Sequence, residues 1–263
     1  MKSYFALARG SYLAVMMYRF SFVFTFIGNL LYIALLYFLW SSIYRGVDTI
    51  RGMSFNQAFV YVALAGSIFT MVRTWADWEI SYHITSGAII MDLIKPLDFQ
   101  LHTLSQTAGF MVFNLTVIAL PSALVLFLFF GADIEMGVRL FFLPVALVLA
   151  FLVSFGLDYI VGLTSFYTES IWGISTTKEI ITTLLSGALV PLQFFPDVAQ
   201  QVLRLLPFQA IYHVPLTILT SPDLGVRACA GLLGTQLVWV LILFLLGRFF
   251  FTRASRVLTV SGG

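Results

Sequence analysis

The sequence has very little charge. Only 10% of its 263 residues are Asp, Glu, Lys or Arg, and 60% are hydrophobic, whereas a soluble domain carries about 25% charged residues. A chain of this composition cannot cover its apolar surface with polar side chains and needs lipid as its solvent. The formal net charge of +2, without any run of Lys or Arg, excludes a typical nucleic-acid-binding protein.

Cysteine is nearly absent and catalytic motifs are missing. The single cysteine, Cys229, excludes an intrachain disulfide. The three histidines, His83, His102 and His213, do not follow a zinc-binding spacing, and no G-x-S-x-G elbow occurs. The chain also contains no Gly-Lys pair, so it has no phosphate-binding loop of the Walker type. We therefore expect no catalytic residue, metal site or cofactor here, and any ATP must bind to another polypeptide.

Long apolar runs dominate what is present. A transmembrane helix needs about 20 mostly apolar residues. Windows of this kind predict an all-α membrane protein with six transmembrane helices, at 20–44, 53–72, 108–130, 140–166, 180–192 and 228–250. The fifth window is short for a full crossing. Together they form a single transmembrane domain over residues 1–263.

The distribution of cations indicates the orientation. An even number of spans places both termini on one side of the membrane. With the termini in the cytoplasm, nine Lys and Arg residues lie inside and five lie outside, in agreement with the positive-inside rule. We expect a multi-pass protein of the cell's inner membrane with both termini cytoplasmic.

Two segments beside the spans have distinctive patterns. Residues 1–19 place apolar side chains at helical spacing between Lys2, Arg9 and Arg19, which predicts an amphipathic helix in the inner interface. A ragged extension of the first span is the alternative. Residues 193–220 predict a broken, partly re-entrant outer segment with short helices between prolines. We assign to this segment Phe194, Phe195, Pro196 and Pro207, together with Pro191, which lies two residues before it.

The segment 84–97 predicts a short helix that docks on a soluble partner. Gly87 and Pro96 bound it, and its apolar residues lie largely on one face. Such a helix is suited to a groove on another protein, although it could instead rest on the membrane surface. The residues assigned to coupling are Ile84, Gly87, Ile90, Leu93, Ile94, Lys95 and Pro96.

Charged residues near the spans have several interpretations. Asp158 is the one ionisable residue inside a predicted span, and such a residue indicates either a transport pathway or a structural pair with a neighbouring helix. Asp77 and Glu79, two positions apart, are expected to form a solvated loop face. Thr176 and Glu179 have capping-box spacing and are expected to begin the fifth span's helix.

The order of these parts resembles the membrane subunit of bacterial type-two ABC exporters. The match covers an interfacial helix before span one, a helix between spans two and three, and a proline-broken segment before span six. Ile84-x-x-Gly87 followed by Leu93-x-Lys95-Pro96-Leu97 is similar to a G…L…RP segment of a subgroup of small permeases, with Lys95 in place of Arg. Pro191 to Pro196 and Leu206-Pro207-Phe208 are also similar to that subgroup.

The resemblance implies partners and a mechanism. Two ATPase subunits would bind ATP and Mg²⁺, and a second permease, related or identical to this chain, would complete the assembly in the lipid bilayer. The 84–97 helix would couple to the ATPases, and cargo would move between the permeases along spans one, two and five. The subgroup is associated with multidrug efflux, which implies export of a hydrophobic or cationic small molecule.

Other classes remain as alternatives. An ATP-independent secondary transporter or channel predicts inverted repeats or several buried charges, and the sequence has no convincing repeat. A membrane-embedded enzyme predicts clustered His, Asp or Glu within the spans, which the sequence does not have. A structural or assembly subunit is compatible with the composition.

Overall fold

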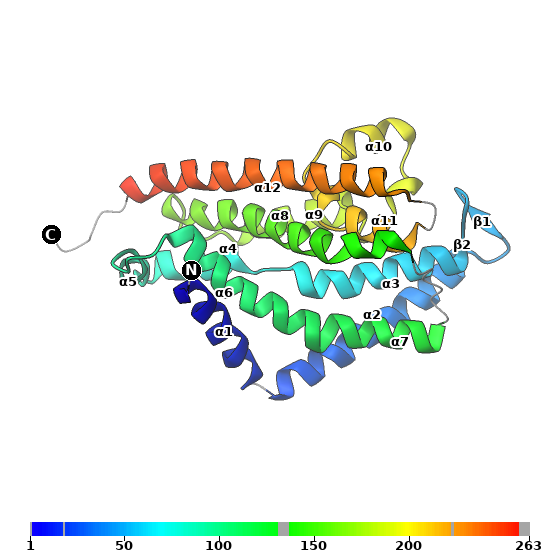
Figure 1. The fold of residues 1–263 in the computed structure, drawn as a ribbon, viewed down its shortest axis with the longest axis horizontal. Coiled ribbons are helices and arrows are strands. Elements are labelled where there is room, and N and C mark those ends of the chain that lie inside the picture. Colours follow the sequence, from blue (N-terminus) through cyan, green and yellow to red (C-terminus); the bar gives the residue numbers. More distant parts are fainter. Residues whose placement is uncertain (1, 18, 131–136, 222–223, 258–263) are drawn as a thin grey trace.

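The fold is a bundle of long helices in this computed structural model, which describes residues 2–17, 19–130, 137–221 and 224–257. Figure 1 shows the longest helices running side by side along the long axis of the molecule, which confirms an all-α membrane protein. The α-helices are α1 (Lys2–Met16), α2 (Arg19–Ile43), α3 (Phe55–Val72), α4 (Ala76–Thr85), α5 (Ile89–Leu93), α6 (Phe99–Asn114), α7 (Leu120–Phe130), α8 (Leu143–Leu163), α9 (Trp172–Leu185), α10 (Asp197–Leu203), α11 (His213–Thr220) and α12 (Val226–Ala254).

Shorter elements connect these helices. A two-residue hairpin, β1 (Thr49–Ile50) with β2 (Met53–Ser54), joins α2 to α3. Its turn residues Arg51 and Gly52 both have positive φ, as two-residue hairpin turns of the primed type require. One π-helical stretch, η1 (Leu115–Ala119), joins α6 to α7, and the 3-10 segments are η2 (Val138–Phe142), η3 (Thr164–Phe166), η4 (Leu192–Phe194), η5 (Phe208–Ala210) and η6 (Ser255–Val257).

Five helical stretches of the described chain are long and apolar enough to cross a membrane. They are Val23–Ile43, Phe55–Thr85, Phe99–Leu128, Val138–Phe166 and Val226–Ala254. The third begins at Phe99, nine residues before the predicted start at 108. The reason is that Asp98 caps the helix through the Leu101 amide, and Gln100 and Thr103 are buried inside the protein.

The predicted fifth span, 180–192, has the wrong bounds. The helix there is α9, which begins at Trp172 and ends at Leu185. Its 14 residues reach only about 21 Å at 1.5 Å per residue. Gly187, with φ +85°, lies just beyond its end. Thr176 is inside α9, so the predicted capping box at Thr176 and Glu179 is also wrong.

The N-terminal helix is separate from the first span. In Figure 1, α1 meets α2 at an elbow, which excludes a simple extension of α2; residues 1 and 18 of the predicted 1–19 helix lie outside the described residues. α1 crosses α6 so closely that a Cβ at Gly109 would lie 2.1 Å from the carbonyl oxygen of Ala8. A small residue at a helix crossing is the usual device for close packing between membrane helices.

The segment 193–220 folds as short helices, as predicted. A side chain of α12 satisfies part of its broken backbone: Gln236 donates through Nε2 to the carbonyl oxygen of Ala210 (2.7 Å), and the same Nε2 also donates to that of Ala146 in α8 (3.0 Å). Pro196 precedes α10 directly, and Pro207 precedes η5. Pro191 precedes η4, where the Phe194 ring lies 5.6 Å from the Trp40 ring, while Phe195 follows that turn.

Figure 1 shows that the chain has two distinct ends. α5 and the start of α1 lie at one end, which we call the α5 end. The hairpin and α10 lie towards the opposite end, the hairpin end. The last turn of α12, at Ala254, also lies at the α5 end.

Candidate functional site

An open groove runs between α2, α3 and the end of α9. It holds about 810 Å³ of open space. Asn29 fixes one wall, because its Nδ2 donates to Ser122 Oγ of α7 at 2.7 Å. Gly66 allows the Tyr32 ring to pack directly on α3. The groove is lined by Thr25, Asn29, Tyr32, Ala65, Gly66, Phe69, Thr70, Thr183, Ala188 and Leu189.

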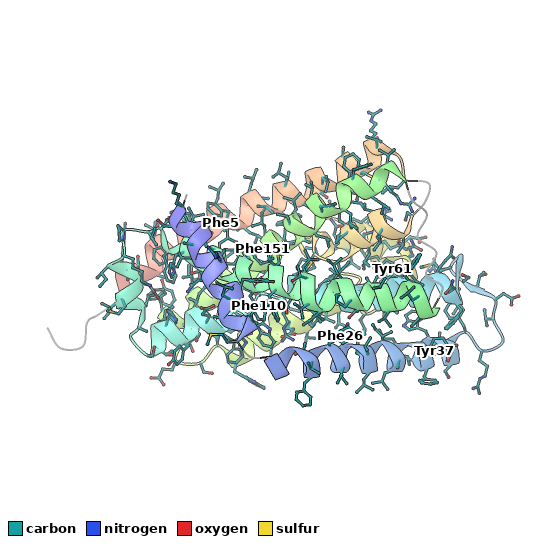
Figure 2. The ribbon with its side chains drawn as sticks, turned by 60° about the horizontal axis from the view of Figure 1, so that its bottom comes forward. Phe5, Phe26, Tyr37, Tyr61, Phe110 and Phe151 are labelled. Carbon is teal, nitrogen blue, oxygen red and sulfur yellow. The ribbon has the colours of Figure 1, made fainter. Side chains whose placement is uncertain are left out.

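A second recess continues the groove beneath the elbow of α1 and α2. We call it the elbow recess; it holds about 1200 Å³ of open space and shares Thr25, Phe69 and Thr70 with the groove. Figure 2 labels Phe110 of α6 beside this elbow. The recess is lined by Ala14, Val15, Thr25, Phe69, Thr70, Arg73, Trp75, Phe110, Phe113, Asn114 and Ile118.

The path of the second span breaks between α3 and α4. Trp75 has φ +53°, a conformation that a bulky residue adopts only where its surroundings hold it. The Arg73 guanidinium lies 3.5 Å from the centre of the Trp75 ring and pairs with Glu179 of α9. The break is therefore held by a cation–π contact and an ion pair to the next wall of the groove.

Beyond the break, α4 packs on α8 around a cluster of buried charges. Gly162 permits this contact, since a Cβ there would lie 3.0 Å from Asp77 Cα. Lys178 of α9 donates to Asp77 at 2.8 Å and also pairs with Asp158. Ser175 Oγ donates to Asp77 at 2.6 Å, and Thr74 donates to Asp158. We call this cluster the ion-paired crevice; about 450 Å³ of open space adjoins it.

At the α5 end, one buried carboxylate holds a tight turn. Asp92 accepts a hydrogen bond from Lys95 at 2.8 Å and bonds to the His83 ring. Burial opposes the charged form, but these partners outweigh it and hold the pKa of Asp92 below its ordinary value. Gly87 makes the turn possible with φ +77°.

An exposed apolar surface surrounds this turn. We call it the α5 patch, and it consists of Tyr82, Ile90, Met91, Leu93 and Ile94. Ile84 is not part of it, because that side chain packs inward against the buried cluster of Ile80 and Ile89. Lys95 and Pro96 are exposed beside the patch.

Residues 30–262 match the family described as ABC-2 family transporter protein. The chain belongs to this family. No curated protein matches it. As an ABC-2 membrane protein it is the permease of an ABC transporter, and the predicted resemblance to type-two ABC permeases is confirmed at this level.

The ABC-2 permease places its predicted site residues in separate regions. Ile90, Leu93 and Ile94 lie on the α5 patch, while Asp158 lines the ion-paired crevice and neither the groove nor the elbow recess. The predicted solvated loop face at Asp77 and Glu79 is wrong for Asp77, which lies on α4 and is only 1% exposed, whereas Glu79 on the same helix is exposed. Asp77 and Glu79 do point apart on their helix, as their spacing requires.

Sequence reasoning missed several of these residues. The sequence predicts no specific role for Lys178 or for Arg73. Asp158 and Gly162 are one helical turn apart, so they lie on the same face of their helix. This spacing could have indicated that Asp158 faces a closely packed helix. No group of three metal-binding side chains occurs among the described residues.

Proposed function

We propose that this ABC-2 permease exports a hydrophobic small molecule as one half of a pathway driven by separate ATPase subunits. The open groove supports this most directly. Its walls come from α2, α3 and the end of α9, the first, second and fifth apolar segments of the bundle. A second permease, related or identical, would close it. The long exposed face of α2, with Leu31, Leu35 and Phe38, would then meet that partner or lipid.

The α5 patch would dock on the ATPases. It is apolar, exposed and held in place by the buried Asp92. Clusters of exposed large apolar side chains are typical of interaction sites in proteins. On this proposal the α5 end is cytoplasmic, both termini lie in the cytoplasm, and the chain resides in the inner membrane. ATP and Mg²⁺ would bind only to the ATPases.

The charged contacts suggest how movement would reach the groove. α4 joins the α5 patch to the break at Arg73, and two ion pairs attach this region to α9: Arg73 with Glu179, and Asp77 with Lys178. A force on α5 would therefore move α9, a wall of the groove, together with α4. Rigid-body movement of this kind is a common basis of alternating access.

The lining of the groove favours an uncharged, hydrophobic cargo over a cationic one. Among the described residues that line the groove and the elbow recess, none is acidic. The nearest carboxylates, Asp77, Asp158 and Glu179, already pair with Lys178 and Arg73. A cationic cargo would have to displace one of these pairs.

Transport in inverted membrane vesicles tests this function. Vesicles that carry the permease with its ATPase should accumulate hydrophobic compounds from a panel only when ATP is supplied. Accumulation should survive an ionophore that dissipates the proton gradient. Uptake that the ionophore abolishes, and that proceeds without ATP, would instead establish a secondary transporter.

A further inference from the structure

One buried polar side chain in the elbow recess has no hydrogen-bond partner among the described residues. Asn114 is only 5% exposed and lines the recess, yet no described residue forms a hydrogen bond with its carboxamide. The carboxamide is not among the fully enclosed polar atoms of the described residues, and Asn114 lines the open space of the recess. A ligand in the recess can therefore form hydrogen bonds with it.

The backbone at Asn114 also departs from regular helix. The π-helical turn η1 begins at the next residue, Leu115, and continues to Ala119. Single π-helical turns inside α-helices occur frequently at functional sites. Here the turn lies where α6 becomes α7, with Ile118 on the wall of the recess.

The described lining of the recess contains a cation and no carboxylate. Arg73 is the one Lys or Arg among its described lining residues, and no carboxylate accompanies it there. The guanidinium lies 3.5 Å from the centre of the Trp75 ring and donates a hydrogen bond to Glu179, which lines the ion-paired crevice. An Arg side chain has five N–H donors, so further donors remain for an anionic group.

The depth of these residues fits a lipid. Counting about 20 residues across the hydrocarbon core from Phe55 at the hairpin end leads to Arg73 at the inner boundary. Counting the same length back from Leu128 places Asn114 about 9 Å inside that boundary, at 1.5 Å per residue. From Arg73 towards the membrane centre, the walls of the recess are apolar and include Phe69, Phe110 and Ile118.

We propose that the elbow recess binds an anionic phospholipid from the inner leaflet. The phosphate accepts hydrogen bonds from Arg73, the Asn114 carboxamide donates to an ester carbonyl of the lipid, and one acyl chain lies along Phe69, Phe110 and Ile118. The inner leaflet rests on the orientation of the proposed function, in which the α5 end is cytoplasmic; binding by the chain itself does not depend on cargo transport or on ATP.

Photocrosslinking in nanodiscs tests this binding. The purified full chain is reconstituted with phosphatidylglycerol that carries a diazirine on its acyl chain, and labelled peptides are mapped by mass spectrometry. Label should concentrate around Phe110 and Ile118. Diazirine-labelled diacylglycerol, which has the ester carbonyls and acyl chains but no phosphate, should label the same peptides about tenfold less.

Matched variants separate lipid binding from the ion pair. Arg73→Gln should reduce phosphatidylglycerol labelling about tenfold, because a hydrogen bond to a charged group is lost. Glu179→Gln breaks the same ion pair but keeps the guanidinium, so labelling should stay within about twofold of the unaltered chain. An equal loss in both variants would overturn the proposal.

A second pair of variants does not disturb the ion pair. Asn114→Leu should lower labelling about fivefold, whereas Thr116→Val, on the exposed side of η1, should leave it unchanged. In every variant, the label could instead be confined to outward-facing positions such as Leu35 and Phe38. That result would show only lipid around the outside of the protein and would contradict the proposal.

Discussion

The ion-paired crevice and the groove lie side by side, and Phe69 lines both, yet they are built in opposite ways. In the crevice, charged residues are buried and each has a partner on another helix. In the groove, apolar and hydroxyl side chains are left open. The crevice joins α4, α8 and α9 at fixed positions, and the groove offers surface to something outside the chain.

This difference reverses the arrangement of a soluble protein, in which charges face the solvent and apolar surface is buried. Charge buried within a membrane bundle is costly and must be paired. The pairs therefore mark which helices move together, and the open apolar surfaces mark where a partner, cargo or lipid can bind.

The largest effect is expected from Lys178→Met. It leaves Asp77 and Asp158 buried without their shared cation, and breaking a buried pair in this way costs about 3–5 kcal/mol. The midpoint of thermal unfolding, followed by size-exclusion chromatography in detergent, should fall strongly. The triple variant Lys178→Met, Asp77→Asn, Asp158→Asn removes all three charges and should recover most of the loss. A triple variant no more stable than the single one would show that pairing is not what holds the crevice.

Leu93→Asp should weaken ATPase binding without destabilising the chain. Leu93 is exposed on the α5 patch, and a charge at a hot spot of an interface costs about 2 kcal/mol, or roughly 30-fold in affinity. The measurement is the amount of ATPase that co-purifies with the tagged permease. Leu205→Asp is the control, since Leu205 is 75% exposed and lies outside the patch. Equal recovery in both variants would exclude the α5 patch as the docking surface.

Gly109→Ala should loosen α1 from α6, one boundary of the elbow recess. The new Cβ would lie 2.1 Å from the Ala8 carbonyl oxygen, and overpacking of this kind costs about 1–3 kcal/mol. Protease cleavage within α1 should become faster. Gly10→Ala is the control, because a Cβ at Gly10 would meet nothing within 4 Å. If both variants resist cleavage as the unaltered chain does, α1 does not depend on this contact.

The smallest effect is expected from the pH dependence of the α5 turn. The folded-state pKa of Asp92 is lowered, so its contribution to stability is complete above the ordinary carboxyl pKa of about 3.9 and is lost as pH falls through the lowered value. The hydrogen-exchange protection of 84–97, corrected for the intrinsic pH dependence of amide exchange, should fall a few-fold below about pH 4, in keeping with a partly exposed cluster. In Asp92→Asn, the segment 84–97 should be weakly protected from exchange at every pH. A pH dependence of protection that persisted in this variant would assign that dependence to another group.

The positions of most membrane-spanning helices were predictable because a long apolar run in the sequence is enough to indicate such a helix. The runs around α2, α3, α8 and α12 have no competing interpretation. The start of α6 was missed because Gln100 and Thr103 look like loop residues but face inward. The fifth span was misplaced because its apolar run continues past Leu185, while Gly187 turns the chain.

The crevice was not predictable because its partners are distant in sequence. Asp77 and Lys178 are 101 positions apart, and nothing local relates them. The same holds for Asn114, which reads as an ordinary polar residue in an apolar run. The segment 84–97 was identified through local signals, Gly87 and Pro96, although its helix is only the five residues of α5.

Accessibility of the groove in the assembled transporter tests the central claim most directly. Cys229→Ala removes the buried native cysteine, and Thr183→Cys places a thiol on the α9 wall of the groove. A membrane-impermeant maleimide, applied from the hairpin end, should label Thr183→Cys much faster when ATP is trapped in the ATPases than in nucleotide-free complex. Equal labelling rates in the two states would contradict a groove that ATP opens to the outside.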